Sequence, residues 1–314
     1  MTIVSPAVEF GVKLPDFSRL ATREGIARTA VLAEELGYDS IWSSDHIAWP
    51  DPATLRSRYP YAEDNSSFMP AGTPWLDCIG SLTFAAALTG RVRLGTTVLV
   101  IGYRPILQQA KALATLDHLA EGRTILGMGV GWMREEFEAL GRPWDRRGRR
   151  ADEMLEILEV LWREELPRFE GPYTSFGPVG FAPKPPAGRI PVWVGGHSEA
   201  AFRRTARFGD AFHSPRMTPD ALGAERDGVR RACEAIDRDP ATVELTTALS
   251  LLFDSTSQRE DLLSGTTERI IAQLGAFAEH GVSHLTLFLF ARGGLEGRLD
   301  VIRRFAEEVM PHFR

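Results

Sequence analysis

Short apolar runs alternate with helical patterns almost from one end of this 314-residue chain to the other, and this alternation limits the folds that the chain can adopt. Each run has the length and composition of a strand, and each is followed by a segment whose apolar residues recur at helical spacing. Strict alternation predicts a parallel sheet of βα units. Because eight such units occur, we predict a single (β/α)8 barrel over residues 1–314, with a doubly wound open sheet as the alternative.

The predicted elements leave two long connections. The predicted strands are 8–14, 39–44, 92–100, 125–130, 190–194, 210–213, 243–253 and 282–290. The predicted helices are 23–36, 75–89, 105–119, 150–165, 198–208, 219–236, 266–279 and 295–310. Residues 45–73 and residues 166–189, which hold six of the 20 prolines, are interpreted as insertions. Long connections in compact domains usually carry function, so we expect the insertions to define the substrate.

The composition argues against several classes of protein. A formal net charge of −6 and an isoelectric point near 5.7 disfavour nucleic-acid binding, which needs a basic surface. No signal-like N-terminus and no long uncharged stretch occur, so we expect neither export nor a membrane span. Cys78 and Cys233 are far apart and lack metal-ligand spacing, so we expect no disulfide framework, no metal site and a cytoplasmic protein.

The fourth predicted strand ends in an unusual glycine run. Gly127, Gly129 and Gly131 alternate with apolar residues, and Trp132 and two glutamates follow. In (β/α)8 barrels the chemistry lies at the carboxyl ends of the strands. Glycine lets backbone or ligand approach closely, so we expect the run to make room for a flat or anionic group. The alternative is an ordinary strand-to-helix turn with Trp132 as a core plug.

Asp45 and His46 directly follow the second predicted strand and form the best acid–base candidate. A histidine exchanges protons near neutral pH, and a strand end places the pair at the barrel mouth. The alternative is a loop pair in which His46 bonds only to backbone groups. His284 precedes a strand core and is predicted to be structural.

The fifth predicted strand ends in Gly195–Gly196, and Ser198 is the expected N-cap of the next helix. Amides at a helix N-terminus bind phosphate or carboxylate groups, so we predict an anion site, with an ordinary capped turn as the alternative. The glycine run at positions 127–131 has GxGxG rather than GxGxxG spacing, so we reject a dinucleotide-binding fingerprint there. No GxSxG, HExxH, GKS, GKT or CxxC motif occurs, which favours a reaction that depends on an organic cofactor.

Two further groups of residues stand out. Four arginines between positions 146 and 150 are predicted to form a solvated face paired with Glu153 and Glu156, with binding of an anionic cofactor tail as the alternative. The tryptophans at positions 42, 49, 75, 132 and 193 lie near strand ends or in the first insertion. If two or three of them face the mouth, an aromatic pocket for a planar ligand follows.

Taken together, four segments resemble the luciferase-like monooxygenase superfamily of flavin and deazaflavin barrels, especially its coenzyme F420-dependent oxidoreductases. They are GYDSIWSSDHI (37–47), RVRLGTTVLVIGYRPILQQAKALATLDHLAEGR (91–123), GVGWMREEFEALG (129–141) and IPVWVGGHSEAAFRRTARFGDAF (190–212). The resemblance covers nearly the whole chain and implies hydride transfer with F420 in a homodimer. An FMN-dependent monooxygenase and a protein that only sequesters cofactor are the alternatives.

The resemblance also implies where the cofactor lies. The ring is expected against a bulge of the third strand, with a cis peptide at Thr97–Val98. His46 is expected near the reactive carbon, and Asp45 completes the cofactor-contacting pair. The other implied contacts are Thr96, Gly129, Gly131, Trp132, Glu135, Gly195, Gly196, His197 and Ser198.

A departure from the resemblance concerns the substrate. The sugar-phosphate dehydrogenases of this branch are similar to this chain but carry an acidic residue where Trp132 stands, so we expect a small, apolar organic substrate. His46 is the expected proton donor or acceptor that accompanies hydride transfer at C5 of F420, with Glu136 as a substitute.

Overall fold

The computed structural model describes residues 7–57, 70 and 72–314, and its main sheet is a closed barrel of parallel strands. Neighbouring strands follow in the order β1, β2, β3, β5, β8, β9, β10 and β12, and β12 pairs with β1 to close the barrel. Their bounds are β1 Glu9–Lys13, β2 Ser40–Ser43, β3 Arg93–Thr96, β5 Thr124–Gly129, β8 Val192–Gly195, β9 Ala211–Pro215, β10 Glu244–Phe253 and β12 Val282–Leu289. The predicted (β/α)8 barrel is confirmed.

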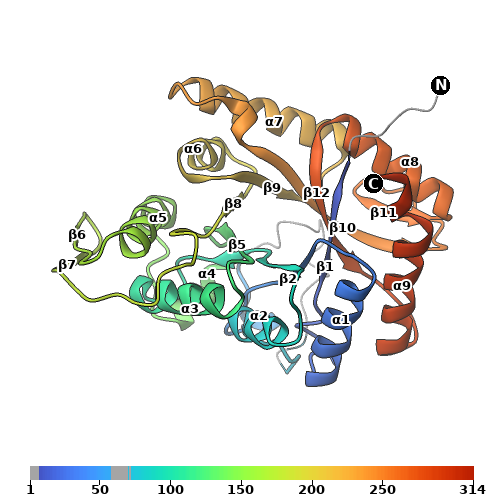
Figure 1. Ribbon diagram of the computed structural model, residues 1–314, viewed down its shortest axis with the longest axis horizontal. Helices are drawn as coiled ribbons and strands as arrows, with labels where there is room; N and C mark the ends of the chain where they lie inside the picture. Colours follow the sequence, from blue (N-terminus) through green and yellow to red (C-terminus); the bar gives the residue numbers. More distant parts are fainter. Residues whose placement is uncertain (1–6, 58–69, 71) are drawn as a thin grey trace.

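Helices follow the barrel strands and lie around the barrel (Figure 1). The α-helices are α1 Arg23–Glu35, α2 Cys78–Ala86, α3 Ile106–Leu119, α4 Arg134–Ala139, α5 Arg147–Arg163, α6 Glu199–Phe208, α7 Pro219–Glu234, α8 Thr267–Glu279 and α9 Gly294–Glu308. Short 3₁₀ helices are η1 Pro52–Thr54, η2 Pro240–Thr242 and η3 Met310–His312. No helix in the described ranges is long and apolar enough to span a membrane.

The third predicted strand is divided in two. After β3, the peptide between Thr97 and Val98 is cis, as expected, and β4 (Leu99–Val100) then pairs with β5. The Thr97 amide donates to the Ser43 carbonyl, so the bulge stays attached to β2. This bulge lies at the carboxyl end of the barrel, beside the loops that carry the candidate site.

The structure contains elements that the apolar pattern did not predict. β11 (Leu262–Gly265) pairs with the end of β10, which extends beyond its pairing with β9. The second insertion, expected to resist regular structure, forms a short hairpin of β6 (Phe169–Glu170) and β7 (Ser175–Phe176) near α5 (Figure 1). These strands are too short to show a period. Much of the first insertion lies outside the described residues.

Trp42 occupies the centre of the barrel. A Cβ added at Gly11 would lie 2.3 Å from the indole Nε1, and one at Gly95 would lie 2.2 Å from a ring carbon. These strand glycines therefore provide the space for the indole. Trp193 packs at 4.9 Å, and the His213 ring stacks at 5.6 Å. Two of the tryptophans considered for the mouth thus fill the interior instead.

Two buried histidines complete this interior. His284 Nε2 lies 2.7 Å from Ser40 Oγ, which fits its predicted structural role. His213 Nδ1 lies 2.8 Å from Thr246 Oγ1, and its Nε2 lies 3.1 Å from Thr97 Oγ1 in the bulge. Burial lowers the pKa of His213 to about 4 and lowers the pKa of His284 well below its usual range. Both rings are therefore neutral at neutral pH.

We predict that His213 makes the fold acid-sensitive. Its pKa is about 4 in the fold and 6.5 ordinarily, so the unfolded chain binds more protons as the pH falls through this window, and the free energy of unfolding decreases. The loss at a pH near 4.5 is about 2 kcal/mol. The free energy of unfolding, measured by urea denaturation at both ends of this pH window, should depend less on pH in His213→Asn than in the original protein. His118→Asn, at an exposed position, should retain the original dependence; equal slopes in all three proteins would contradict this assignment.

Candidate active site

Glu136 is fully buried in α4 and accepts hydrogen bonds from the loops after β2 and β4. Its Oε2 lies 2.7 Å from His46 Nδ1 and accepts a 2.7 Å bond from the Tyr103 hydroxyl. Its Oε1 accepts from the amides of Ile47 at 2.6 Å and Ala48 at 3.0 Å. Burial would raise the pKa of Glu136, but the bonds and charge of His46, with those of Tyr103 and the Ile47 amide, lower it overall. Glu136 is therefore ionised and fully engaged.

This arrangement fixes the proton on His46. Because both Glu136 oxygens act as acceptors, His46 Nδ1 must carry a hydrogen and donate it. Burial raises the pKa of Tyr103, so its hydroxyl also stays protonated. The Nε2 atom of His46 is then the ring nitrogen without a hydrogen in the neutral form. Glu136, predicted as a substitute for His46 in proton transfer, contacts it directly, and the catalytic roles of both residues stay predictions.

Three tryptophans surround the His46 ring. Trp75 lies at 4.5 Å, Trp49 at 4.8 Å and Trp132 at 6.1 Å between ring centroids, and each meets the imidazole edge to face. Trp49 and Trp75 stack on each other at 5.5 Å. The His46 side chain is 12% exposed. The predicted aromatic surroundings therefore occur at His46, built from these three residues.

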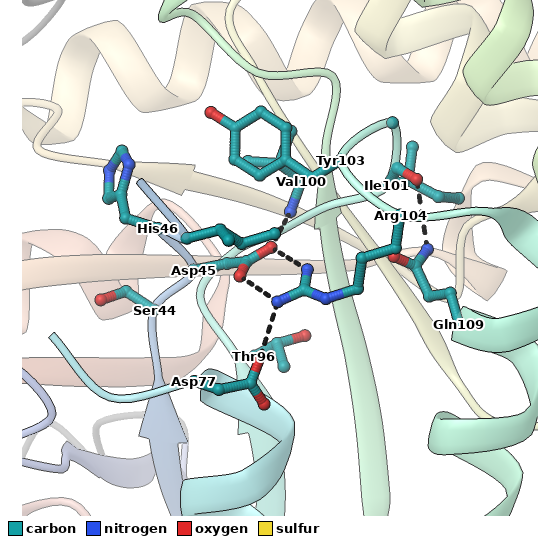
Figure 2. A network of polar contacts seen from close by, with 12 residues as sticks. Ser44, Asp45, His46, Asp77, Thr96, Val100, Ile101, Tyr103, Arg104 and Gln109 are labelled. Atoms are coloured by element: carbon teal, nitrogen blue, oxygen red, sulfur yellow. Dashed lines mark hydrogen bonds and ion pairs between the residues drawn. The ribbon is translucent and has the colours of Figure 1, made fainter. Parts of the chain in front are cut away.

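Asp45 points away from His46, as Figure 2 shows. Its carboxylate receives two bonds of 2.8 Å from the Arg104 guanidinium and a 3.0 Å bond from the Val100 amide. Arg104 also pairs with Asp77 at the start of α2 at 2.7 Å. Asp45 therefore braces the segment after the bulge, and His46 contacts Glu136 rather than its neighbour Asp45. The implied contact of Asp45 with a cofactor stays a prediction.

Glu135 anchors the first insertion. Its Oε1 accepts from the amides of Arg56 at 2.6 Å and Ser57 at 2.9 Å. Its Oε2 is buried and has no hydrogen-bond partner within the described residues. The two adjacent glutamates thus hold two different stretches of the loop after β2, and the implied contact of Glu135 with a cofactor stays a prediction.

The glycine run accommodates neighbouring protein atoms. A Cβ added at Gly129 would lie 2.7 Å from Val98, and one at Gly195 would lie 3.2 Å from the same side chain. At Gly131, where φ is +81°, it would lie 2.6 Å from Phe137. The space that a side chain would need at these three positions is therefore taken up by neighbouring atoms, and the expected approach of a flat or anionic group stays a prediction. The glycines bring the bulge close to the ends of β5 and β8.

The predicted anion turn follows β8. Ser198 is the N-cap of α6, as expected, and its hydroxyl accepts from the Ala201 amide at 3.3 Å. Gly196 has a φ of +130°, which glycine readily adopts. His197 Nδ1 lies 2.9 Å from Glu225 Oε1 in α7. The Glu225 carboxylate thus contacts the His197 imidazole at this turn.

The threonines of the bulge are both bonded within the protein. Thr96 donates to the Gly127 carbonyl at 2.7 Å, and Thr97 lies beside His213. The Thr246 hydroxyl donates to the Phe212 carbonyl, so it accepts from His213 Nδ1. The Nε2 of neutral His213 therefore accepts from Thr97.

The predicted pairing of the arginine cluster with Glu153 and Glu156 is wrong. Glu156 pairs with Arg207 of α6 at 2.5 Å, and Glu153 accepts from the Tyr173 amide at 3.0 Å. The helical phase of α5 turns these carboxylates toward α6 and the hairpin.

Sequence reasoning missed three residues of this site. Tyr103 and Arg104 lie three and four residues after the end of the third predicted strand, and their position near a strand end was an available signal. Glu225 lies within α7, where nothing in the local pattern distinguishes it from other helix glutamates.

Comparisons with known proteins agree with this fold. The family model of luciferase-like monooxygenases matches residues 8–281. An F420-dependent glucose-6-phosphate dehydrogenase of Nakamurella multipartita is 32% identical over 272 residues, covering 83% of this chain and 72% of that protein. The monooxygenase RslO1 of Streptomyces bottropensis has a TM-score of 0.80 at 21% identity, covering 98% of this chain and 100% of that one. An F420-dependent secondary alcohol dehydrogenase with an F420–acetone adduct has a TM-score of 0.78 at 18% identity, covering 98% and 100%.

We predict that Glu136→Gln reverses the tautomer of His46. A glutamine oxygen would serve the Ile47 and Ala48 amides, so its amide group would donate to His46 Nδ1 and move the ring hydrogen to Nε2. Nitrogen-15 NMR of the histidine rings measures this directly. Tyr103→Phe is the matched control, because it removes another bond to Glu136 and should leave the Nδ1–H form unchanged. An Nδ1–H form in Glu136→Gln would contradict the prediction.

Proposed function

The chain belongs to the luciferase-like monooxygenase family of oxidoreductases, and we propose that it catalyses hydride transfer between coenzyme F420 and a small, apolar organic substrate. The observation that carries the proposal is His46, whose Nδ1 is held by Glu136 and whose ring lies among three tryptophans. The relative named as an F420-dependent dehydrogenase and the neighbour with an F420–acetone adduct support this cofactor.

The described residues fit a planar, phosphorylated cofactor. Val98 packs against Gly129 and Gly195, so the bulge and two strand ends form one close-packed floor at the barrel mouth. The Gly195–Gly196 turn leads into α6, whose N-terminus favours a phosphate. We assign the floor to the ring and the turn to the phosphate, with His197 and Ser198 beside it.

When bound, F420 would accept or donate the hydride at its C5 carbon. His46 Nε2 takes up or returns the proton that accompanies oxidation of a hydroxyl or reduction of a carbonyl. Glu136 stabilises the imidazolium that forms when His46 accepts this proton. Trp49, Trp75 and Trp132 provide apolar surfaces around the His46 ring and limit the access of water to it.

The same aromatic residues support an apolar substrate. Trp132 presents an indole 6.1 Å from the His46 ring, and a large aromatic surface favours apolar groups over a charged phosphate. We therefore infer a small alcohol or carbonyl compound rather than a sugar phosphate.

An FMN-dependent monooxygenase is the second candidate. The similarity in fold to a monooxygenase favours this candidate. A phosphate site at the Gly195–Gly196 turn would serve F420 and FMN equally. It requires oxygen activation by the reduced flavin, with the same floor and turn holding FMN.

Separate titrations with F420 and FMN test the choice of cofactor. We expect saturable quenching of F420 fluorescence and much weaker binding of FMN. Tight FMN binding without F420 binding would overturn the proposal. Turnover of bound F420 with a panel of secondary alcohols and ketones then distinguishes an enzyme from a protein that only sequesters the cofactor.

We predict that Trp132→Glu changes substrate preference more than cofactor affinity. A carboxylate near His46 disfavours an apolar substrate, so kcat/KM for such a substrate should fall by about tenfold or more. The Kd for F420 should change by less than about threefold, which is under 1 kcal/mol. Trp132→Phe is the control and should retain most activity. An equal loss of F420 binding in Trp132→Glu would assign Trp132 to the cofactor site.

A further inference from the structure

A pocket of about 300 Å³ lies beside α5, between the loop after β4, the connection from α4 to α5, and the tip of the β6–β7 hairpin. None of the residues around His46 lines it. Its apolar wall consists of Ile106, Leu107, Phe137 and Met154. The charged residues of its lining are three arginines and Glu153, so the charges are not balanced within the pocket.

Three arginines line this pocket: Arg142, Arg147 and Arg150. Among the described residues, none of the three forms an ion pair with a carboxylate. The neighbouring acids of α5 are engaged elsewhere, since Asp152 pairs with Arg204 at 2.6 Å and Glu156 with a second arginine of α6.

Two of the guanidinium groups are held in place by other contacts. Arg147 donates through Nε to the Gly131 carbonyl at 3.0 Å and lies 3.7 Å over the Trp144 ring. Arg142 donates through Nε to the Gly102 carbonyl at 3.0 Å. These contacts fix the orientation of the groups and leave further N–H donors on each of them.

Arg150 and Glu153 have unpartnered polar atoms at the pocket. Arg150 lies 4.3 Å over the Tyr173 ring of the hairpin, and its buried Nε has no hydrogen-bond partner among the described residues. Glu153 is 5% exposed, and its buried Oε1 also lacks a partner in the part of the chain that the structure describes. The pocket therefore offers unpartnered donors and one unpartnered acceptor, which favours a ligand with complementary groups.

The positive charges also destabilise one another. Burial lowers the pKa of the Arg142 guanidinium, and the nearby charge of Arg150 lowers it further. Burial likewise lowers the pKa of Arg147. Arginine stays protonated at neutral pH, so a bound anion would relieve this repulsion.

We propose that this pocket binds a small organic anion that also carries a hydrogen-bond donor. The anionic group is recognised by Arg142, Arg147 and Arg150, the hydroxyl or amino group donates to Glu153 Oε1, and the carbon skeleton packs on the apolar wall. The volume suits a ligand of a few carbon atoms. None of the residues assigned above to the ring or the phosphate of F420 lines this pocket.

Isothermal titration with citrate and with inorganic phosphate, at constant ionic strength set by chloride, tests the proposal. We expect saturable binding of at least one of these anions. Arg150→Gln should weaken that binding by about tenfold or more, the loss expected for one charge-assisted bond. Arg149→Gln is the matched control, because Arg149 is exposed on the same helix and does not line the pocket.

Absence of saturable binding of both anions would overturn the proposal, as would equal affinities in all three proteins. The latter result would place the anion elsewhere, for example at the Gly195–Gly196 turn. Equal weakening by both substitutions would indicate a general effect of surface charge and would also overturn it. Among the residues that the structure describes, the Arg150 side chain makes no hydrogen bond that the substitution would break, and Arg142→Gln provides a second variant if Arg150→Gln melts early. Because the readout uses neither F420 nor turnover, it is independent of the proposed function.

Discussion

The ionised Glu136 carboxylate is the constraint on which the candidate site depends. Its two oxygens accept from His46, Tyr103, Ile47 and Ala48, so one buried charge connects α4 with the loops after β2 and β4. A buried carboxylate is stable only when hydrogen bonds replace its hydration. The same bonds that stabilise the charge therefore also set the path of the loop and the tautomer of His46.

Asp45 and His46 are adjacent in the sequence, but their side chains point in opposite directions. Asp45 turns toward Arg104 and fixes the segment that follows the bulge, whereas His46 turns toward the tryptophans. Val98 then packs on Gly129 and Gly195, which brings three strand ends together. The residues proposed for proton transfer and the structural groups thus share the rim of the barrel, and the glycine run allows the strand ends to pack closely there.

The barrel and the position of His46 could be predicted from the sequence because alternation and strand ends are local patterns. The N-cap at Ser198 and the cis peptide at Thr97–Val98 were expected and are present. The contact between His46 and Glu136 could not be predicted, since it joins residues 90 positions apart. Nor could local sequence separate Trp42 from Trp132, because strand register and barrel curvature decide which indole faces inward.

The fit between Trp42 and its two glycines has an evolutionary consequence. Any side chain at Gly11 or Gly95 would overlap the indole, so neither position can change while the tryptophan remains. Loss of the tryptophan first would leave a cavity that costs about 3–5 kcal/mol. Each single step is therefore harmful even where the combined change would be tolerated. We therefore expect homologues to keep or change the residues at these three positions together.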